Sequence, residues 1–333
     1  LHVVPGYYPT IRIYGDLFQL TTLEIITFEN AEKMLISILN HEQKEMLLAN
    51  REIDLAYKLN DTRFRVNLYY AQNLLCGSFR LIEAKIRTIE QLSLPAYLHQ
   101  CADLHQGLVL LTGPTGEGKS TTLASIVNEI NQKYARHIIT IEDPIEYVYP
   151  KYKSIISQRE LHQDTHSWTV ALKSALREDP DVILVGEMRD YETISLALTA
   201  AETGHLVFST LHTNSAPESI DRIIDNFPPH QQNQIKNQLS TVLKIIVTQR
   251  LLPKQNEAGR IPGVEILVNT AAVASSIREG KTFLISNILE TSESEGSLLF
   301  EKNLLKLYQD GLISKEIAMT YAIRPKEIAR LIR

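Results

Sequence analysis

The chain has 333 residues, of which 44% are hydrophobic and 22% are charged, and this composition is typical of a globular protein with more than one domain. Its formal net charge of −5 argues against a protein that clamps a nucleic-acid backbone over a wide face, so we expect no nucleic-acid partner. No apolar run reaches the roughly 18 residues that a membrane-spanning helix needs, and no signal peptide is visible. We therefore expect a cytoplasmic protein. Because the first residue is Leu1 rather than Met, we also expect a short native leader before it.

Residues 1–97 are expected to form a small α+β domain. Two segments run rich in β-forming residues, one has apolar residues at helical spacing, and one Asn-Asp pair is typical of a hairpin turn. The expected strands are Tyr8–Tyr14 and Arg63–Tyr70, the expected helix is Glu29–Asn40, and the expected turn is Asn60-Asp61.

Residues 98–270 are expected to form an α/β domain with a mainly parallel sheet and helices on both faces, because strands and helices alternate along them. The expected strands are Gly107–Thr112, His137–Ile141, Val182–Val185 and Leu206–Ser209, and the expected helices are Ser120–Gln132, Thr169–Arg177 and Thr193–Ala201.

Residues 271–333 are expected to form a helical C-terminal part. Its helices are expected at Leu299–Tyr308, Lys315–Tyr321 and Lys326–Ile332. The polar stretch Ser292–Gly296 is the expected mobile loop.

The cysteines Cys76 and Cys101 form no CxxC pair and are too few for a four-cysteine zinc site. We expect reduced thiols and no zinc module. Cysteine usage is therefore typical of a cytosolic protein.

The segment Gly113–Ser120 fits the pattern G-x-x-x-x-G-K-[ST] of a phosphate-binding loop, and it lies between an expected strand and an expected helix. Its glycines let backbone N–H groups close around a phosphate, and the helix N-terminus adds about half a positive charge. Lys119 can reach the β- and γ-phosphates of ATP, and Ser120 can hold Mg²⁺. The predicted nucleotide-binding residues are Gly113, Pro114, Thr115, Gly116, Glu117, Gly118, Lys119, Ser120 and Thr121.

Carboxylates follow two of the expected strands. The apolar segment Asp181–Val185 leads to Glu187, where an acid can polarise the attacking water or hold Mg²⁺, so Glu187 is the candidate catalytic base. A second strand ends in Glu142, Asp143 and Glu146. Acids this close repel one another unless a cation or a base is near, so Mg²⁺ or an activated water would account for them. A solvated acidic turn is the alternative.

His205 and His212 bracket the expected strand Leu206–Ser209. A single histidine is most often structural, but a pair that flanks one strand beside a phosphate site favours contact with the γ-phosphate or with the ligands of Mg²⁺. Core or capping roles are the alternative. A structural zinc site is disfavoured because no cysteine lies nearby in the sequence.

Four segments together carry a resemblance to a known family. They are Gly113–Thr122, Ile139–Tyr147, Ser174–Asp190, which reads SALREDPDVILVGEMRD, and Leu198–Asp225, which reads LTAAETGHLVFSTLHTNSAPESIDRIID. On these segments the chain resembles the secretion-type ATPases of the additional-strand, RecA-like branch, and within them the type IV pilus retraction ATPases of the PilT family. The resemblance covers nearly the whole chain.

The resemblance implies a homohexamer that hydrolyses ATP with Mg²⁺, each nucleotide lying between a PAS-like N-terminal domain and a RecA-like P-loop ATPase domain. It implies action at the inner face of the cytoplasmic membrane on an inner-membrane pilus platform protein. By motif match, Lys119 binds phosphate, Ser120 holds Mg²⁺ and Glu187 is the catalytic glutamate. The other matched residues are the Asp-box acid Glu146, which would hold Mg²⁺ or water, and the His-box pair His205 and His212.

The resemblance also implies that the N-terminal domain supplies arginines to the nucleotide, and Arg63, Arg65 and Arg80 stand in the matching segments. A guanidinium aimed at the γ-phosphate would stabilise charge in the transition state. Ordinary exposed strand arginines are the alternative. Pilus-extension and type II secretion ATPases usually carry a four-cysteine zinc module, so its absence here favours retraction.

Departures from the family leave alternatives open. Ala272–Glu279 reads AVASSIRE where retraction motors read AIRNLIRE, Glu290–Phe300 lacks their QTG…GMQT stretch, and Asn73-Leu74 stands where relatives have Arg-Gly. The alternatives are an accessory retraction ATPase, a secretion or DNA-uptake ATPase, a weakly hydrolysing ATP-binding regulator and, third, a nucleic-acid translocase. The direction of pilin transport, the hexamer symmetry and the identity of the membrane partner do not follow from the sequence.

Overall fold

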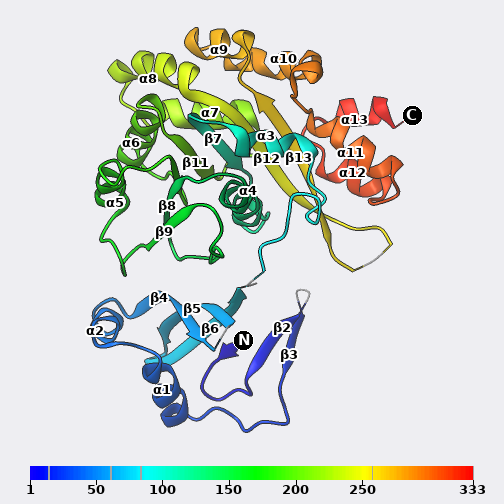
Figure 1. Ribbon diagram of the computed structural model, residues 1–333. Helices are drawn as coiled ribbons and strands as arrows, with labels where there is room; N and C mark the ends of the chain where they lie inside the picture. The colour runs from blue at the N-terminus through cyan, green and yellow to red at the C-terminus, as the bar shows by residue number, and fades with distance from the viewer. Residues whose placement is uncertain (14–15, 61, 83–84, 257, 333) are drawn as a thin grey trace. The chain divides into compact units, whose positions relative to one another are not determined.

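The computed structural model describes residues 1–13, 16–60, 62–82, 85–256 and 258–332 (Figure 1). The chain divides into two compact units, residues 1–85 with 144–148 and residues 86–143 with 149–333. These units differ from the predicted division at residues 97 and 270. Ile89 and Leu94 are buried in the core of the second unit, and the helical residues 271–333 also pack in that unit.

The first unit is an antiparallel sheet with the helices α1 and α2. Its strand order is β3-β2-β1-β6-β5-β4. Alternate residues of β5 face the core, where Val66 and Leu68 are buried together with Leu35 of α1. The elements are β1 (His2–Val3), β2 (Thr10–Ile13), β3 (Asp16–Gln19), α1 (Phe28–Ser37), α2 (His41–Asn50), β4 (Glu52–Leu59), β5 (Thr62–Ala71) and β6 (Leu74–Ile82).

The strands predicted for this unit are found with adjusted ends. The predicted strand Arg63–Tyr70 is confirmed as β5. It pairs with β4 in the predicted hairpin, where Asn60 adopts a left-handed φ of 55° and Asp61 lies outside the described residues. Of the predicted strand Tyr8–Tyr14, the part from residue 10 to residue 13 forms β2, and Tyr14 also lies outside the described residues.

The predicted helix Glu29–Asn40 ends earlier, at Ser37, and Asn40 is instead the N-cap of the next helix, α2. The Asn40 side chain accepts a hydrogen bond from the Gln43 backbone N–H at 2.8 Å, and the Asn40 N–H donates to Gln43 Oε1 at 3.0 Å. This reciprocal cap satisfies backbone donors at the start of α2, which the sequence analysis does not predict.

The second unit is built on a sheet with strand order β13-β12-β7-β11-β10-β8-β9, in which β13 is antiparallel to β12 and the other neighbours are parallel. The central strands are buried along their length, which explains their apolar sequences. One core lies toward α3 and α4, the other toward α5 to α8. The strands are β7 (Gly107–Thr112), β8 (His137–Glu142), β9 (Ile155–Glu160), β10 (Val182–Val185), β11 (Leu206–Leu211), β12 (Leu243–Pro253) and β13 (Arg260–Val268).

The predicted α/β fold is therefore confirmed, and its predicted strands and helices are present in this unit. Strands β9, β12 and β13 and helices α7 and α8 are not predicted by the sequence analysis. The runs Ile245–Val247 and Ile261–Val268 carry the apolar signal of buried strands, but short apolar runs do not separate a strand from a buried helix. The helices are α3 (His99–Asp103), α4 (Lys119–Lys133), α5 (Trp168–Ala175), α6 (Tyr191–Glu202), α7 (Ala216–Asp225) and α8 (Pro229–Val242).

The C-terminal part is helical, as predicted. The predicted mobile loop Ser292–Gly296 instead contains a short 3₁₀ turn, Glu293–Glu295, and Gly296 has a φ of +95°. A side chain there could not fit, because a Cβ atom on Gly296 would lie 1.9 Å from the ring of Tyr97. The helices are α9 (Ala271–Arg278), α10 (Ile285–Thr291), α11 (Phe300–Gln309), α12 (Lys315–Tyr321) and α13 (Pro325–Leu331).

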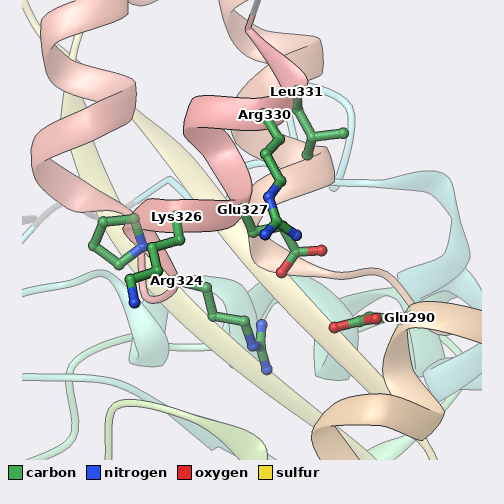
Figure 2. A pocket seen from close by; sticks show the side chains of 7 residues that line it. Glu290, Arg324, Lys326, Glu327, Arg330 and Leu331 are labelled. Carbon is green, nitrogen blue, oxygen red and sulfur yellow. The ribbon is translucent and has the colours of Figure 1, made fainter.

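A buried charge cluster fastens these helices to the sheet. The Arg324 guanidinium donates to Glu301 at 3.0 Å and to Glu265 of β13 at 3.3 Å, and both carboxylates are fully buried. Burial raises the pKa of Glu265. Arg324 also borders a pocket beside α10 and α13 (Figure 2), together with Glu290, Pro325, Lys326, Glu327, Arg330 and Leu331. The Arg324 guanidinium thus pairs with two buried carboxylates, and substitution of Arg324 would leave both without this counter-charge.

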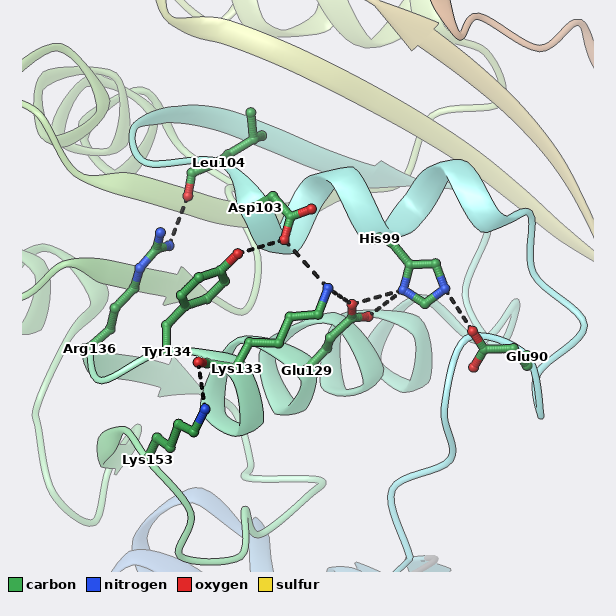
Figure 3. Close-up of polar contacts among 9 residues, drawn as sticks. All are labelled: Glu90, His99, Asp103, Leu104, Glu129, Lys133, Tyr134, Arg136 and Lys153. Carbon is green, nitrogen blue, oxygen red and sulfur yellow. Dashed lines mark hydrogen bonds and ion pairs between the residues drawn. The ribbon is translucent and has the colours of Figure 1, made fainter.

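A chain of polar side chains joins α3 and the segment before it to α4 (Figure 3). His99 Nδ1 lies 2.8 Å from both carboxylate oxygens of Glu129, and His99 Nε2 lies 2.7 Å from Glu90. Lys133 contacts Glu129 at 2.6 Å and Asp103 at 3.5 Å. The hydrogen bond to Glu129 is the main cause that raises the pKa of His99. The cationic form of His99 is therefore the one that this contact stabilises.

We predict that this contribution to stability depends on pH. Because the folded-state pKa of His99 lies above 6.5, its stabilisation is complete below pH 6.5 and is lost as the pH rises through the folded-state value. His99→Gln, which cannot become a cation, should lower the thermal midpoint by about 2 °C at pH 5.5 and by under about 1 °C at pH 8.5, since water screens the pair. Differential scanning fluorimetry at both pH values measures this, and a larger loss at pH 8.5 contradicts it.

Candidate functional site

The parallel strands of the second unit bring separate sequence motifs to one edge of the sheet. Thr112 at the end of β7 pairs with Leu211 at the end of β11, and Val185 at the end of β10 pairs with both Ser209 and Ile141. The residues that follow these strand ends therefore meet there. This is the edge at which open α/β sheets bind ligands.

The phosphate loop follows β7 and leads into α4. Gly113, Gly116 and Gly118 have φ values of 140°, 85° and 78°, a region that favours glycine. A Cβ on Gly113 would lie 2.3 Å from the carbonyl oxygen of Gln249, so only glycine lets the loop approach β12 this closely. A glycine-rich loop of this shape that leads into the start of a helix, here the 15-residue α4, is typical of an anion-binding element.

Lys119, the first residue of α4, is nearly buried, and its ammonium stays inside the loop. It donates to the carbonyl oxygens of Gly113 at 2.5 Å and Pro114 at 2.8 Å. Ser120 is exposed on the first turn of the helix, where its hydroxyl can reach a cation beside bound phosphates. The predicted nucleotide-binding residues from 113 to 121 thus form one continuous loop and helix start.

His212 connects the phosphate loop to the acid after β10. Its Nδ1 lies 3.4 Å from Lys119 Nζ and 3.3 Å from Thr115 Oγ1, and its Nε2 lies 3.2 Å from Glu187 Oε1. An ammonium can only donate, so Nδ1 accepts and the proton on Nε2 faces Glu187. The imidazole is thus oriented by contacts on both sides. Lys119, His212 and Glu187, all predicted site residues, form one connected set.

Glu187 has a second partner, Arg189, which the sequence analysis does not single out. The guanidinium of Arg189 lies 2.9 Å from Glu187 Oε2, and this hydrogen bond is the main cause that raises the pKa of Arg189. The Arg189 side chain is 69% exposed, whereas Glu187 is 20% exposed. The carboxylate therefore sits at the rim of the site, with one oxygen toward His212 and the other toward a solvent-facing cation.

The acids after β8 occupy different places. Glu142 accepts from Thr140 at 2.6 Å and from Gln158 at 3.2 Å, so local partners hold it. Asp143 contributes to the electrostatic environment of Arg189. Glu146 belongs to the segment 144–148, which packs with the first unit.

His205 requires a correction. It precedes β11, and its carbonyl oxygen accepts from the N–H of Gly107 at the start of β7. Its ring lies 2.9 Å from the carbonyl oxygen of Ala200, at the end of the sheet away from the phosphate loop. A six-residue strand spans about 20 Å, so His205 does not join His212 at this site and holds a turn instead.

The predicted arginines belong to the first unit. Arg65 on β5 lies directly opposite Arg80 on β6, and Arg63 is two residues before Arg65, so the three share one face of the sheet. Arg65 lies 4.0 Å from Asp54 on β4. Arg80 is exposed, and the other two are half-buried. The face is thus rich in cations.

Gln249 is a residue of the site that sequence reasoning missed. Its side chain is 2% exposed on β12 and contacts both the phosphate loop and α4, donating to the Glu117 carbonyl oxygen at 2.6 Å and accepting from Thr122 Oγ1 at 2.8 Å. The only signal in the sequence is an amide next to a threonine inside an apolar run, which does not name its partners.

These residues fit ATP with Mg²⁺. No group of three or more His, Cys, Asp or Glu side chains that could hold a metal ion occurs in the part of the chain that the structure describes. Mg²⁺ is commonly held by one or two protein oxygens, water and the phosphates themselves. The Ser120 hydroxyl and the nearby Glu187 carboxylate are suited to that limited role. No helix within the described ranges is long and apolar enough to cross a membrane.

Comparison with known proteins covers nearly the whole chain. Residues 60–320 match the family model for "Type II/IV secretion system protein". The chain is 42% identical over 327 residues to the type IV pilus retraction ATPase PilT of Pseudomonas aeruginosa, covering 98% of this chain and 94% of that protein. It is 45% identical over 311 residues to a twitching motility protein of Neisseria gonorrhoeae, covering 93% of this chain and 83% of that protein.

The same likeness holds in three dimensions. The crystal structure of the pilus retraction motor PilT with bound ADP matches this chain with a TM-score of 0.92 and 43% sequence identity. The match covers 99% of this chain and 94% of that one. The fold class predicted from the sequence is therefore also the fold of a solved relative.

We predict that Glu187→Gln separates binding from chemistry. Glutamine keeps the size of the side chain and one acceptor oxygen but cannot act as a base. Binding of a fluorescent ATP analogue should change by less than about threefold, while phosphate release falls by about 10²-fold or more. A fall of less than tenfold would remove Glu187 as the base and make Glu146 the leading candidate.

Arg189→Gln is the matched control for this variant. Because Arg189 is mostly exposed, water screens its ion pair with Glu187, and turnover should change by less than about threefold. A loss in Arg189→Gln as large as that in Glu187→Gln would mean that the ion pair, rather than the base, limits hydrolysis.

Proposed function

The chain belongs to the type II/IV secretion system protein family and is a PilT-like ATPase within it, and from this premise we propose that it powers the retraction of type IV pili by ATP hydrolysis. The observation that carries the proposal is the contact from Lys119 through His212 to Glu187, which joins a phosphate-binding loop to a carboxylate at 3.4 Å and 3.2 Å. Binding and chemistry are then adjacent in one site.

ATP binding uses the loop and the start of α4. The N–H groups of Gly113 and of residues 115–118 surround the β-phosphate, and the Lys119 ammonium turns from its own loop carbonyls toward the β- and γ-phosphates. The Ser120 hydroxyl would hold Mg²⁺, and that ion would supply positive charge against the charge that develops on the phosphate oxygens. The resident hydrogen bonds of Lys119 keep it in position before the nucleotide arrives.

Hydrolysis uses Glu187. Its carboxylate accepts a hydrogen bond from the attacking water and so orients the water toward the γ-phosphorus. The Nε2–H of His212 holds one carboxylate oxygen, which leaves the other for water once Arg189 moves away. Because Nδ1 of the same ring meets Lys119, a shift of the ammonium toward phosphate changes the contacts of His212 and hence the position of Glu187.

The working unit is a homohexamer in this proposal. Arg63, Arg65 and Arg80 are proposed as sources of charge for the γ-phosphate, and Glu146 is proposed as a further acid that acts on Mg²⁺ or water. Rotation of one unit against the other then acts on an inner-membrane platform protein at the cytoplasmic face of the membrane, and pilin subunits leave the fibre base. The likeness to a retraction ATPase and to a twitching motility protein supports this role.

A second candidate, an accessory ATPase of the same machine, is favoured by one observation on α9. In the segment that reads AVASSIRE, Ser276 is buried and donates back to the Ala272 carbonyl oxygen at 3.0 Å, whereas Ala274 and Ser275 are half-buried. Small side chains thus replace the larger ones that retraction motors carry there. This helix can therefore engage a different partner surface while the nucleotide site stays intact.

Deletion of the gene separates these roles. Loss of the principal retraction motor should give excess surface pili without twitching, and loss of an accessory ATPase should leave twitching reduced but present. Cells without pili would instead indicate assembly and contradict retraction. Steady-state phosphate release by the purified protein tests the enzyme activity, and the absence of release in the presence of Mg²⁺ would favour a non-hydrolysing regulator.

Lys119→Ala should abolish tight ATP binding and leave the fold intact. The substitution removes the charge nearest the phosphates, together with the donor to the carbonyl oxygens of Gly113 and Pro114. Affinity for a fluorescent ATP analogue should fall by at least about 10²-fold, with the thermal midpoint changed by under about 3 °C. Unchanged affinity contradicts the assignment of the loop.

The arginine face gives a further prediction. Arg80→Ala should lower the rate of ATP hydrolysis by about tenfold or more and change ADP affinity by less than about threefold, since its charge is used in the transition state. Specific activity of the wild-type protein should also rise with protein concentration where hexamers form. Lys33→Ala, at an exposed position on α1, is the control and should match the wild type. Equal rates in all three proteins would exclude Arg80 from the site.

A further inference from the structure

Strand β12 separates the phosphate loop from the C-terminal helices and contacts both. Gln249 faces the loop, and the next residue, Arg250, faces the helices, because side chains alternate along a strand. Arg250 Nη1 donates to the carbonyl oxygen of Tyr321 at 3.0 Å, and its guanidinium lies 5.6 Å from the centre of the Phe300 ring. Consecutive residues of one strand thus touch the nucleotide loop and the helical part.

The Gln249 side chain holds two parts of the phosphate-binding element together. Its amide nitrogen donates to the carbonyl oxygen of Glu117 in the loop at 2.6 Å, and its amide oxygen accepts from the Thr122 hydroxyl on α4 at 2.8 Å. The side chain is almost completely buried, so water does not replace either partner. Only an amide supplies a donor and an acceptor at these two positions at once.

The backbone around Gln249 contacts the same loop. The Gly113 backbone approaches the Gln249 carbonyl so closely that a Cβ there would overlap it at 2.3 Å. The Leu251 N–H donates to the carboxylate of Glu117. Both ends of the loop therefore rest on residues 249–251, and a change of loop shape must be accommodated by this short stretch of β12.

We propose that Gln249 is a positioning residue that sets the shape of the phosphate loop and, through its neighbour Arg250, transmits the nucleotide state to the C-terminal helices. When Lys119 leaves the carbonyl oxygens of Gly113 and Pro114 for a phosphate, the loop peptides are free to reorient. The Glu117 carbonyl is bonded to Gln249, so reorientation of the loop acts on β12 and then on Tyr321 and Phe300.

This inference rests on the proposed ATPase function and adds a route by which the nucleotide state reaches the C-terminal helices. The test uses the full chain and three variants. Gln249→Met removes both side-chain hydrogen bonds at similar volume, Gln249→Glu keeps the acceptor for Thr122 but loses the donor to Glu117, and Thr122→Val removes one bond from the other side. A fluorescent ADP analogue measures affinity, and phosphate release measures kcat and KM for ATP.

Asn131 on α4 offers a matched control. It is a fully buried amide on the same helix, donating to the Pro150 carbonyl oxygen at 2.7 Å and accepting from the Ser154 N–H at 3.3 Å, but it lies at the other end of α4 from the loop. Asn131→Leu should lower the thermal midpoint as much as Gln249→Met does while leaving the kinetic constants within about twofold. A merely structural role for Gln249 would make the two variants alike.

We expect the ADP analogue to bind about tenfold more weakly to Gln249→Met, which leaves two buried groups unpaired, and about threefold more weakly to Thr122→Val, which leaves one. Gln249→Glu should also weaken binding about tenfold, because it leaves the Glu117 carbonyl oxygen unpaired and places a carboxylate oxygen against it. Hydrogen exchange tests the transmission. In the wild type, saturating ADP should slow exchange in the loop and in residues 315–321. In Gln249→Met at saturating ADP, the effect on the loop should persist and the effect on residues 315–321 should be lost.

The outcomes distinguish this inference from the proposed function. A wild-type chain that neither binds nor hydrolyses ATP overturns the proposed function and this inference with it. A wild-type chain that does both, with variants of unchanged affinity and kcat, overturns only the role of Gln249. Unaltered exchange at residues 315–321 when ADP binds the wild type overturns the transmission. Should Gln249→Met not fold, Thr122→Val and Gln249→Glu decide the question by the same measurements.

Discussion

The site depends on one constraint, the parallel register of β7, β11, β10 and β8. Their buried hydrogen-bond ladders hold four strand ends at one edge of the sheet, so segments separated by up to 100 residues in the chain begin at neighbouring points. The phosphate loop, Glu187 and His212 each follow such an end within two residues. A strand buried on both faces has little freedom to shift, and this rigidity places loop residues that would otherwise be mobile.

The same constraint places His212 between Lys119 of the phosphate loop and Glu187. A histidine one residue beyond β11 lies between a loop that starts after β7 and an acid that comes after β10, because β11 is the strand between those two. Its two nitrogens have different tasks, one accepting near Lys119 and one donating to Glu187. The ring can thus relate the position of a cation to that of a carboxylate.

The second unit also contains two physical connections between this edge and the C-terminal helices. One is β12, where Gln249 and Arg250 face opposite sides. The other begins at α7, which follows His212 in the chain. The N–H of Ala216 at the start of α7 donates to buried Glu265 at 3.2 Å, and Glu265 is paired with Arg324. Because buried charges tolerate little loss of pairing, this cluster resists independent movement of the helices it joins.

The sequence alone predicted the α/β class, the phosphate loop and the acid Glu187, because each rests on local signals. The class rests on alternating strands and helices, the loop on a glycine-rich turn between a strand and a helix start, and Glu187 on the apolar strand before it. It also placed β5 and the last helices within one or two residues. Only the tertiary structure decided that His212 contacts Lys119 and Glu187 while His205, seven residues earlier, lies at the opposite end of the same strand. The direction of β11 across the sheet is a property of strand pairing, not of the residues beside it. The role of Gln249 was likewise decided by tertiary structure, since its partners Glu117 and Thr122 lie more than 120 residues away in the chain, and an amide in an apolar strand carries no local sign of what it will meet.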